Sequence, residues 1–233
     1  MSQKVTTHVL LAGLALSLLV LAGALPSFHL PGNQEDYQPH QPIAFSHRLH
    51  SSELAIDCLY CHYAAEKSRH AGIPAASICM NCHKFITATM GAFQAEDKAR
   101  LLALAKEEER PSNPVISKEL AKLYEALGLD DKTRERDSEK SQQPIAWIKV
   151  HNLPDFVYFD HRSHLIAGVE CQQCHDAGEM VDTAMETVDT MEQVRQMQSL
   201  TMGWCVNCHR EVNQLGVNEK DVHASLDCTT CHY

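Results

Sequence analysis

Apolar residues are distributed unevenly along this chain of 233 residues. The longest apolar run is VLLAGLALSLLVLAGAL at Val9–Leu25, which carries no charge and follows Lys4. At about 1.5 Å per residue a helix of this length covers roughly 26 Å, close to the thickness of a hydrocarbon core. We therefore expect an N-terminal transmembrane anchor over residues 1–30. A cleaved signal peptide is the alternative, because AGA at 22–24 satisfies the small-x-small rule for signal peptidase.

A second pattern lies in residues 94–143, which contain no cysteine or histidine but many charges. Leucines recur there at helical spacing on both sides of Pro111 and Pro114, which break the run. These leucines are Leu101, Leu102, Leu104, Leu120, Leu123 and Leu127. We expect two amphipathic helices in this segment, called the charged insert below. It would form a solvated helical cover over the core, with partner binding as the alternative role.

All ten cysteines belong to five copies of the pattern C-x-x-C-H. In c-type cytochromes the two thiols form thioether bonds to porphyrin vinyl groups, and the following histidine ligates the iron. Chance placement would give on the order of 0.03 such pentapeptides in this composition. We therefore predict five covalently attached haem c groups. The cysteines are Cys58, Cys61, Cys79, Cys82, Cys171, Cys174, Cys205, Cys208, Cys228 and Cys231, and the histidines of sites 1 to 5 are His62, His83, His175, His209 and His232.

Two other uses of C-x-x-C explain the pattern less well. Structural zinc requires pairs that converge two by two, and five pairs leave one without a partner. Redox-active disulfides would not require a histidine at the same offset every time.

The sites fall into two groups on either side of the charged insert. Residues 31–93 hold sites 1 and 2 and form the predicted first haem module; residues 144–233 hold sites 3 to 5 and form the second. QPIAFSHRLH before site 1 is echoed by FVYFDHRSH before site 3, which indicates a duplicated unit. The predicted fold is mainly α with extensive irregular loops. The haems would form much of its core, because porphyrin contacts replace polypeptide packing.

Fifteen histidines leave ten candidates for the sixth iron ligand, after the five within the sites. His8, His29 and His40 lie in or near the anchor and linker and are poor candidates. The F-x-H-x-x-H pairs His47/His50 and His161/His164 are the best, because the pattern occurs twice, each time upstream of a site. Residues three apart on a helix share a face but diverge, so the two rings of a pair can reach different irons.

The remaining candidates have no repeat to support them. His151 and His70 are weaker choices, and His223 is weaker still, with an exposed loop position as its alternative. Met202, three residues before Cys205, could ligate through sulfur and raise the reduction potential. Plain packing beside Trp204 is the alternative for Met202.

An iron with two strong axial ligands has no open position, so this histidine supply indicates electron transfer rather than substrate chemistry. The formal net charge of −10 makes nucleic acid an unlikely partner, and haem propionates would add to it. Covalent haem attachment takes place on the oxidising side of a membrane. We therefore expect a bacterial inner-membrane location with the haem domain on the periplasmic side.

Longer stretches resemble the pentahaem subunit of bacterial alternative complex III, within the class III multihaem cytochrome c superfamily. They are FSHRLH, SRHAGIP ahead of ICMNCH, VHNLPDFVYFDHRSH and LTMGWCVNCHRE, and the resemblance covers about residues 40–95 and 144–233. It implies a quinol:electron-acceptor oxidoreductase. The implied partners are an iron–sulfur, molybdopterin-like subunit, polytopic quinol-binding membrane subunits and a monohaem cytochrome c. Electrons would leave toward a soluble cytochrome, a copper protein or a terminal oxidase.

Two alternatives remain at this stage. A stand-alone membrane-anchored quinol dehydrogenase would ordinarily carry four sites, so the fifth site and the charged insert count against it. A multihaem reductase of a small oxyanion would usually keep one altered attachment site, and no altered site is visible here.

Overall fold

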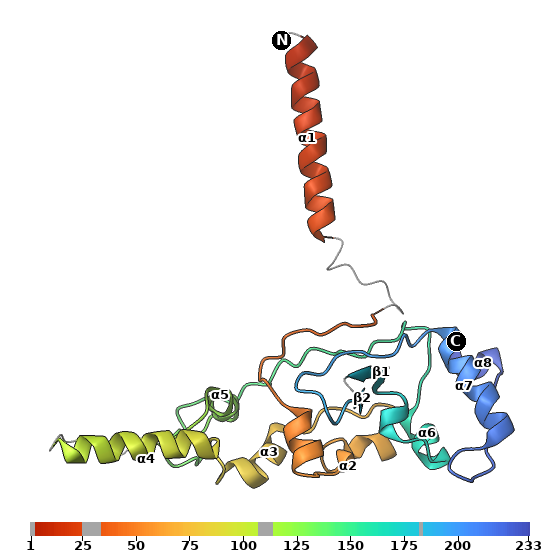
Figure 1. Ribbon diagram of the computed structural model, residues 1–233. Helices are drawn as coiled ribbons and strands as arrows, with labels where there is room; N and C mark the ends of the chain where they lie inside the picture. Colours follow the sequence, from red (N-terminus) through yellow and green to blue (C-terminus); the bar gives the residue numbers. More distant parts are fainter. Residues whose placement is uncertain (1–2, 25–33, 107–113, 182–183) are drawn as a thin grey trace.

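The computed structural model of the chain describes residues 3–24, 34–106, 114–181 and 184–233 (Figure 1). The described part is mainly helical, with long irregular connections, as the sequence predicts. The α-helices are α1 (Gln3–Ala24), α2 (Cys58–Cys61), α3 (Ala76–His83), α4 (Met90–Ala105), α5 (Lys118–Leu127), α6 (His161–Ala167), α7 (Met202–Leu215) and α8 (Cys228–Cys231). Shorter turns are the π-helical η2 (Arg48–Glu53) and the 3₁₀ turns η3 (Tyr63–Glu66) and η4 (Cys171–Gln173). The strands β1 (Asp176–Val181) and β2 (Ala184–Thr187) form an antiparallel hairpin.

Helix α1 stands apart from the rest of the chain in Figure 1, and its large apolar side chains, from Val9 to Leu21, are more than half exposed. Across the described residues, no helix is both long enough and apolar enough to cross a membrane. The structure therefore does not confirm the expected transmembrane helix.

Each C-x-x-C pair lies on a helical turn, which brings its two sulfurs to the same side of the backbone. Asp57 caps α2 by accepting a hydrogen bond from the backbone N–H of Leu59 at 2.7 Å. Asp227 caps α8 in the same way, by accepting a hydrogen bond from the backbone N–H of Thr229 at 2.9 Å. An aspartate before the first cysteine of sites 1 and 5 thus starts the turn by supplying an acceptor for an unpaired N–H. At site 3, Cys171 instead begins the 3₁₀ turn η4 and Cys174 is the residue that ends it.

The charged insert contains the two expected helices, with different boundaries and different packing. Helix α4 begins at Met90, four residues before the insert, and Leu101, Leu102 and Leu104 are more than half exposed. Figure 1 shows α4 extending away from the haem-site helices. The expected cover is therefore not provided by α4 in the described part of the chain.

Helix α5 does pack against the body of the protein. Leu123 and Tyr124 are buried, and the Tyr124 hydroxyl donates to the carbonyl oxygen of His83 at 2.6 Å. Ser117 caps the amino end of α5, and Gly128 ends it in the left-handed region with φ of 62°. The helix therefore carries a hydrogen bond directly to the histidine of site 2.

The polypeptide buries few apolar residues of its own. In the described ranges they are Ala65, Ala103, Leu123, Tyr124, Val150, Met191, Met197 and Val217. Met191 and the fully buried Gln196 lie where the segment after β2 meets the segment before site 1. There the backbone N–H of Arg48 donates to Met191 at 2.8 Å, and Gln196 bonds with Asp36 and Tyr37. The chain before site 1 is thus held by residues more than 140 positions later.

Candidate haem-binding sites

Three attachment-site histidines each face a second histidine ring. His47 faces His62 of site 1, with ring centroids 6.4 Å apart and planes 5° from parallel. His50 faces His83 of site 2 at 6.0 Å and 60°. Both distal rings come from the first F-x-H-x-x-H segment, so one short segment reaches two sites.

The second F-x-H-x-x-H segment supplies the third pair. His164, on α6, faces His209 of site 4, on α7, with centroids 6.2 Å apart and planes at 39°. In both copies, the second histidine of the segment faces the even-numbered site of its module.

These separations fit an iron between the rings. A bond from an imidazole nitrogen to a metal such as zinc is about 2 Å long, and a ring centre lies about 1 Å beyond its nitrogen. Two imidazoles on opposite faces of one metal therefore have centroids about 6 Å apart. Sites 1, 2 and 4 meet this requirement, so their residues fit a haem with two histidine ligands.

Hydrogen bonds at Nδ1 leave Nε2 available for a metal. The Nδ1 atoms of three site histidines contact backbone carbonyls: His62 that of Gly72, His83 that of Ile86 and His209 that of Ser225, at 2.6–2.7 Å. A carbonyl oxygen only accepts, so each Nδ1 carries the proton and Nε2 keeps its lone pair. Metal-bound histidines ordinarily have such a partner.

Three distal candidates have the same arrangement. Nδ1 of His50 contacts the carbonyl of Ser46 at 2.8 Å, and that of His164 contacts Asp160 at 2.9 Å. Nδ1 of His161 contacts the carbonyl of Arg69 at 2.8 Å, which joins the second F-x-H-x-x-H segment to the first half of the chain.

Sites 3 and 5 differ from the other three. His151 lies beside His175 of site 3 with centroids only 4.4 Å apart, and its Nε2 is 3.2 Å from Nδ1 of His175. The ring beside His232 of site 5 is Phe156, at 5.8 Å. The structure therefore brings His151 to a site, but not at the spacing of a metal-centred pair.

Burial keeps several of these imidazoles neutral, which is the form that binds a metal. Burial lowers the pKa of His47 to about 4, with a further contribution from His62. It lowers the pKa of His151 to about 3, with His175 the next cause. The pKa of His164 is also lowered by burial. All three rings would carry a free lone pair at neutral pH.

The remaining candidates lie elsewhere. His70 and His223 are exposed, and Met202 is 65% exposed on the first turn of α7. His8 and His40 are exposed, and His29 lies outside the described residues. For His40, His70, His223 and Met202, no ring contact or hydrogen bond in the described part of the chain joins the side chain to a site histidine.

The cysteines show which sites are neighbours. None of the ten lies in a disulfide, and the side chains of Cys58 and Cys171 lie within hydrogen-bond reach of each other. Sites 1 and 3 therefore meet, although they belong to different predicted modules. Cys61 likewise lies near Cys79, and Cys205 lies near Cys231.

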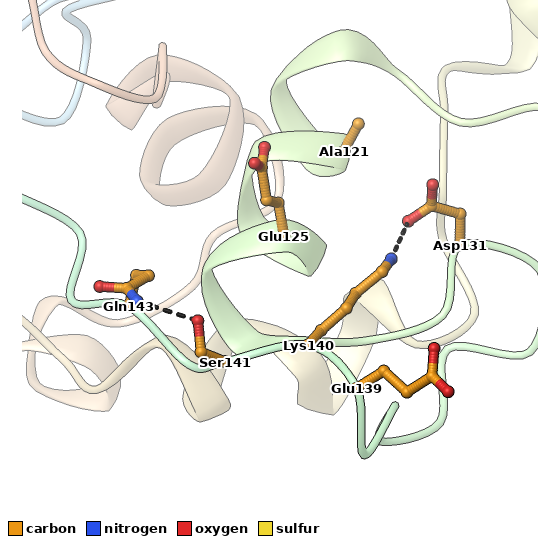
Figure 2. Close-up of a pocket in the computed structure, with 7 residues that line it drawn as sticks. All are labelled: Ala121, Glu125, Asp131, Glu139, Lys140, Ser141 and Gln143. Carbon is orange, nitrogen blue, oxygen red and sulfur yellow. Dashed lines mark hydrogen bonds and ion pairs between the residues drawn. The ribbon is translucent and has the colours of Figure 1, made fainter.

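A surface cavity of about 520 Å³ lies beside α5 (Figure 2). Its lining includes Glu125, Asp131, Glu139 and Lys140, and Lys140 pairs with Asp131 at 3.6 Å. All of its lining residues belong to 121–143, which carries no cysteine or histidine. The lining of this cavity therefore includes no haem-attachment residue and no candidate iron ligand.

Sequence comparison agrees with this geometry. Residues 157–233 match the family described as cytochrome c7 and related cytochrome c. The chain is similar to multihaem cytochromes c. The multihaem cytochrome c subunit of menaquinone reductase from Nitratidesulfovibrio vulgaris is 24% identical over 207 residues, which cover 84% of this chain and 78% of that subunit. Both matches are described as cytochromes c.

Sequence reasoning missed the groups that support the histidines. The Tyr124 hydroxyl and the carbonyls of Gly72, Ile86 and Arg69 were not anticipated. Backbone carbonyls leave no residue-type signal, so only the fold could reveal them. The phenylalanine at the start of each F-x-H-x-x-H segment was visible as a repeated letter.

Proposed function

We propose that this chain is a pentahaem c-type cytochrome that relays electrons. The observation that carries the proposal is the set of three facing histidine pairs at 6.0–6.4 Å, which would give the irons of sites 1, 2 and 4 two nitrogen ligands each. Five C-x-x-C-H sites support the haem count. Bound haem supplies one-electron redox chemistry, while the protein orients the imidazoles, keeps them neutral and excludes other ligands from the irons.

We also propose that the chain is a subunit of a quinol:electron-acceptor oxidoreductase of the alternative complex III type. The similarity to a menaquinone reductase subunit supports a quinone-linked complex. The partners would be an iron–sulfur, molybdopterin-like subunit, polytopic quinol-binding subunits and a monohaem cytochrome c. Electrons would pass to a soluble cytochrome c, a copper protein or a terminal oxidase.

The proposed location is the periplasmic face of the bacterial inner membrane. The need for covalent haem attachment outside the cytoplasm supports this location. The uncharged run Val9–Leu25 and the exposed apolar side chains of α1 support attachment to the membrane through α1, alone or together with the membrane subunits.

Purification from the native membrane in mild detergent tests the complex. The chain should co-purify with integral-membrane subunits. Its haems should be reduced when quinol is added to the purified complex. A lone pentahaem chain that is fully active with quinol would instead support the stand-alone dehydrogenase. Extraction at alkaline pH tests attachment, because a chain released without detergent is not held through α1.

Electron paramagnetic resonance of the oxidised protein separates relay from catalysis. We expect low-spin ferric signals from the sites with two histidine ligands. Site 5 is the place to look for a catalytic alternative, because Phe156 is the ring beside His232. A high-spin signal that shifts when nitrite or sulfite is added would favour a reductase.

A further inference from the structure

One phenylalanine ring contacts both histidines in the first F-x-H-x-x-H segment. The Phe45 ring meets His47 edge-on, with centroids 4.9 Å apart and planes at 83°. The same ring stacks on His50 at 4.3 Å and 26°. His47 and His50 face different sites, so a single side chain borders the imidazoles of two proposed haems.

The second segment repeats this geometry. Phe159 meets His161 edge-on at 4.8 Å and 88°, and it stacks on His164 at 4.6 Å and 29°. The backbone is not identical in the two copies, because η2 is a π-helical turn and α6 is an α-helix. The ring arrangement is therefore preserved although the helix type differs, which points to a role for the ring itself.

Each stacked imidazole has two restraints on its rotation. Phe45 covers one face of His50, and the Ser46 carbonyl holds its Nδ1 at 2.8 Å. His164 is held in the same way, by Phe159 and the Asp160 carbonyl.

The edge-on imidazoles are held differently. Nδ1 of His161 is fixed on the Arg69 carbonyl, whereas the buried Nδ1 of His47 has no hydrogen-bond partner among the residues that the structure describes. The ring contact with Phe45 is therefore more important for His47 than the equivalent contact is for His161. Aromatic pairs favour such edge-to-face and offset-stacked geometries over other orientations.

We propose that Phe45 and Phe159 are positioning residues for the imidazoles they contact. Phe45 would fix the rotation of His47 and His50 and so adjust the irons of sites 1 and 2 together, and Phe159 would fix His164 and so adjust the iron of site 4. The inference rests on the proposed haem ligation. It matters because the angle between the axial imidazole planes sets the energies of the iron d orbitals. That angle differs between sites, at 5° for site 1, 60° for site 2 and 39° for site 4.

The test uses the full-length oxidised holoprotein with Phe45→Leu, studied by low-temperature electron paramagnetic resonance. Parallel imidazole planes give rhombic low-spin signals, and strongly rotated planes give highly anisotropic ones. We expect the site 1 signal to move toward greater anisotropy as His47 loses its edge contact, and the site 2 signal to broaden. The other signals should be unchanged. Phe45→Tyr, which keeps the aromatic ring, should give the wild-type spectrum.

Two further variants make the assignment specific. Phe159→Leu should change the site 4 signal and leave sites 1 and 2 unaltered. Phe93→Leu is the matched control, because Phe93 lies on α4, where no histidine ring contacts it in the described structure. If Phe45→Leu loses haem, Phe45→Met serves in its place, because the flexible methionine side chain fills irregular gaps without a planar face.

The outcomes distinguish the positioning role of Phe45 from the haem ligation on which it rests. A wild-type spectrum in Phe45→Leu or Phe45→Met with full haem content overturns the positioning role. An equal change in every signal also overturns it, since that would be a general structural effect. Absence of low-spin haem signals from the wild-type protein would instead remove the proposed function on which the inference rests.

Discussion

Backbone carbonyl oxygens fix the orientation of three site histidines by binding their Nδ1 atoms. His62, His83 and His209 all place Nδ1 on a carbonyl from a loop downstream of their own helix. The side chain that reaches site 2 from outside its module is Tyr124, whose hydroxyl binds the His83 carbonyl. Tyr124 thus connects the charged insert to the histidine of site 2 through a hydrogen bond.

Tyr124→Phe should lower the free energy of unfolding by about 1 kcal/mol, because it removes a part-buried hydrogen bond to the His83 carbonyl without opening a cavity. Denaturant unfolding of the holoprotein measures the effect. Tyr63→Phe is the control, since the Tyr63 side chain is half exposed. Equal effects from both variants would show that the Tyr124 bond contributes nothing specific.

His164 and Met202 compete as the sixth ligand of site 4, and the structure favours His164. His164→Ala should convert one low-spin haem to high spin or to a weaker ligand set, because its ring faces His209. Met202→Leu should leave the spectrum unchanged, because Met202 is 65% exposed. Near-infrared magnetic circular dichroism distinguishes them: a sulfur-to-iron band lost in Met202→Leu would reverse the assignment.

At the scale of elements, the sequence predicts the attachment turns and both helices of the charged insert because their signals are local. A C-x-x-C turn needs only adjacent residues, and helical spacing of leucines needs only one helix. The packing of α4 was not predictable from its leucines, because periodicity shows which face is apolar but not whether anything covers it. The 3₁₀ turn at site 3 carries no distinct residue signal either.

The end of α5 offers a sharp test of local geometry. Arg136 donates to the carbonyls of Gly128, Asp137 and Lys140 at 2.7–2.8 Å, closing the loop after the helix. A Cβ at Gly128 would overlap the Arg136 guanidinium and lie 3.0 Å from the Lys140 carbonyl.

Gly128→Ala should therefore lower the free energy of unfolding by about 1–3 kcal/mol, because alanine would also have to adopt a left-handed backbone conformation. Thermal unfolding measures it. Gly91→Ala is the matched control: it lies near the start of α4, a Cβ there meets nothing within 4 Å, and helix propensity favours alanine. Destabilisation of similar size in both would contradict the Arg136 explanation.

For the whole molecule, residue patterns predict two groups of sites and a chain with a small polypeptide core. They do not predict that sites 1 and 3 touch through Cys58 and Cys171, because that contact joins residues far apart in sequence. They predict His47, His50 and His164 as iron ligands because the pattern is repeated, and in the structure these three rings face site histidines. They also predict His161 as a ligand and His151 as a weaker one, but the structure gives His151 only a close contact with His175 and holds Nδ1 of His161 on the Arg69 carbonyl.

The net charge of −10 belongs to the whole molecule and predicts a dependence on salt. Electron transfer to a basic soluble cytochrome should slow several-fold as ionic strength rises, because screening shortens the reach of the attraction to about 10 Å at 0.1 M. Stopped-flow kinetics measure this rate. An acidic carrier protein provides the comparison, and electron transfer to it should become faster or stay unchanged as ionic strength rises. An identical salt dependence of the two rates would exclude electrostatic steering.

The contacts between early and late residues also bear on how the chain matures. An exported chain emerges amino end first, so Arg69 is available before His161, whose ring binds its carbonyl. Cys58 likewise precedes Cys171, the thiol it meets in the folded chain. The first half would then serve as the template on which the second half is completed.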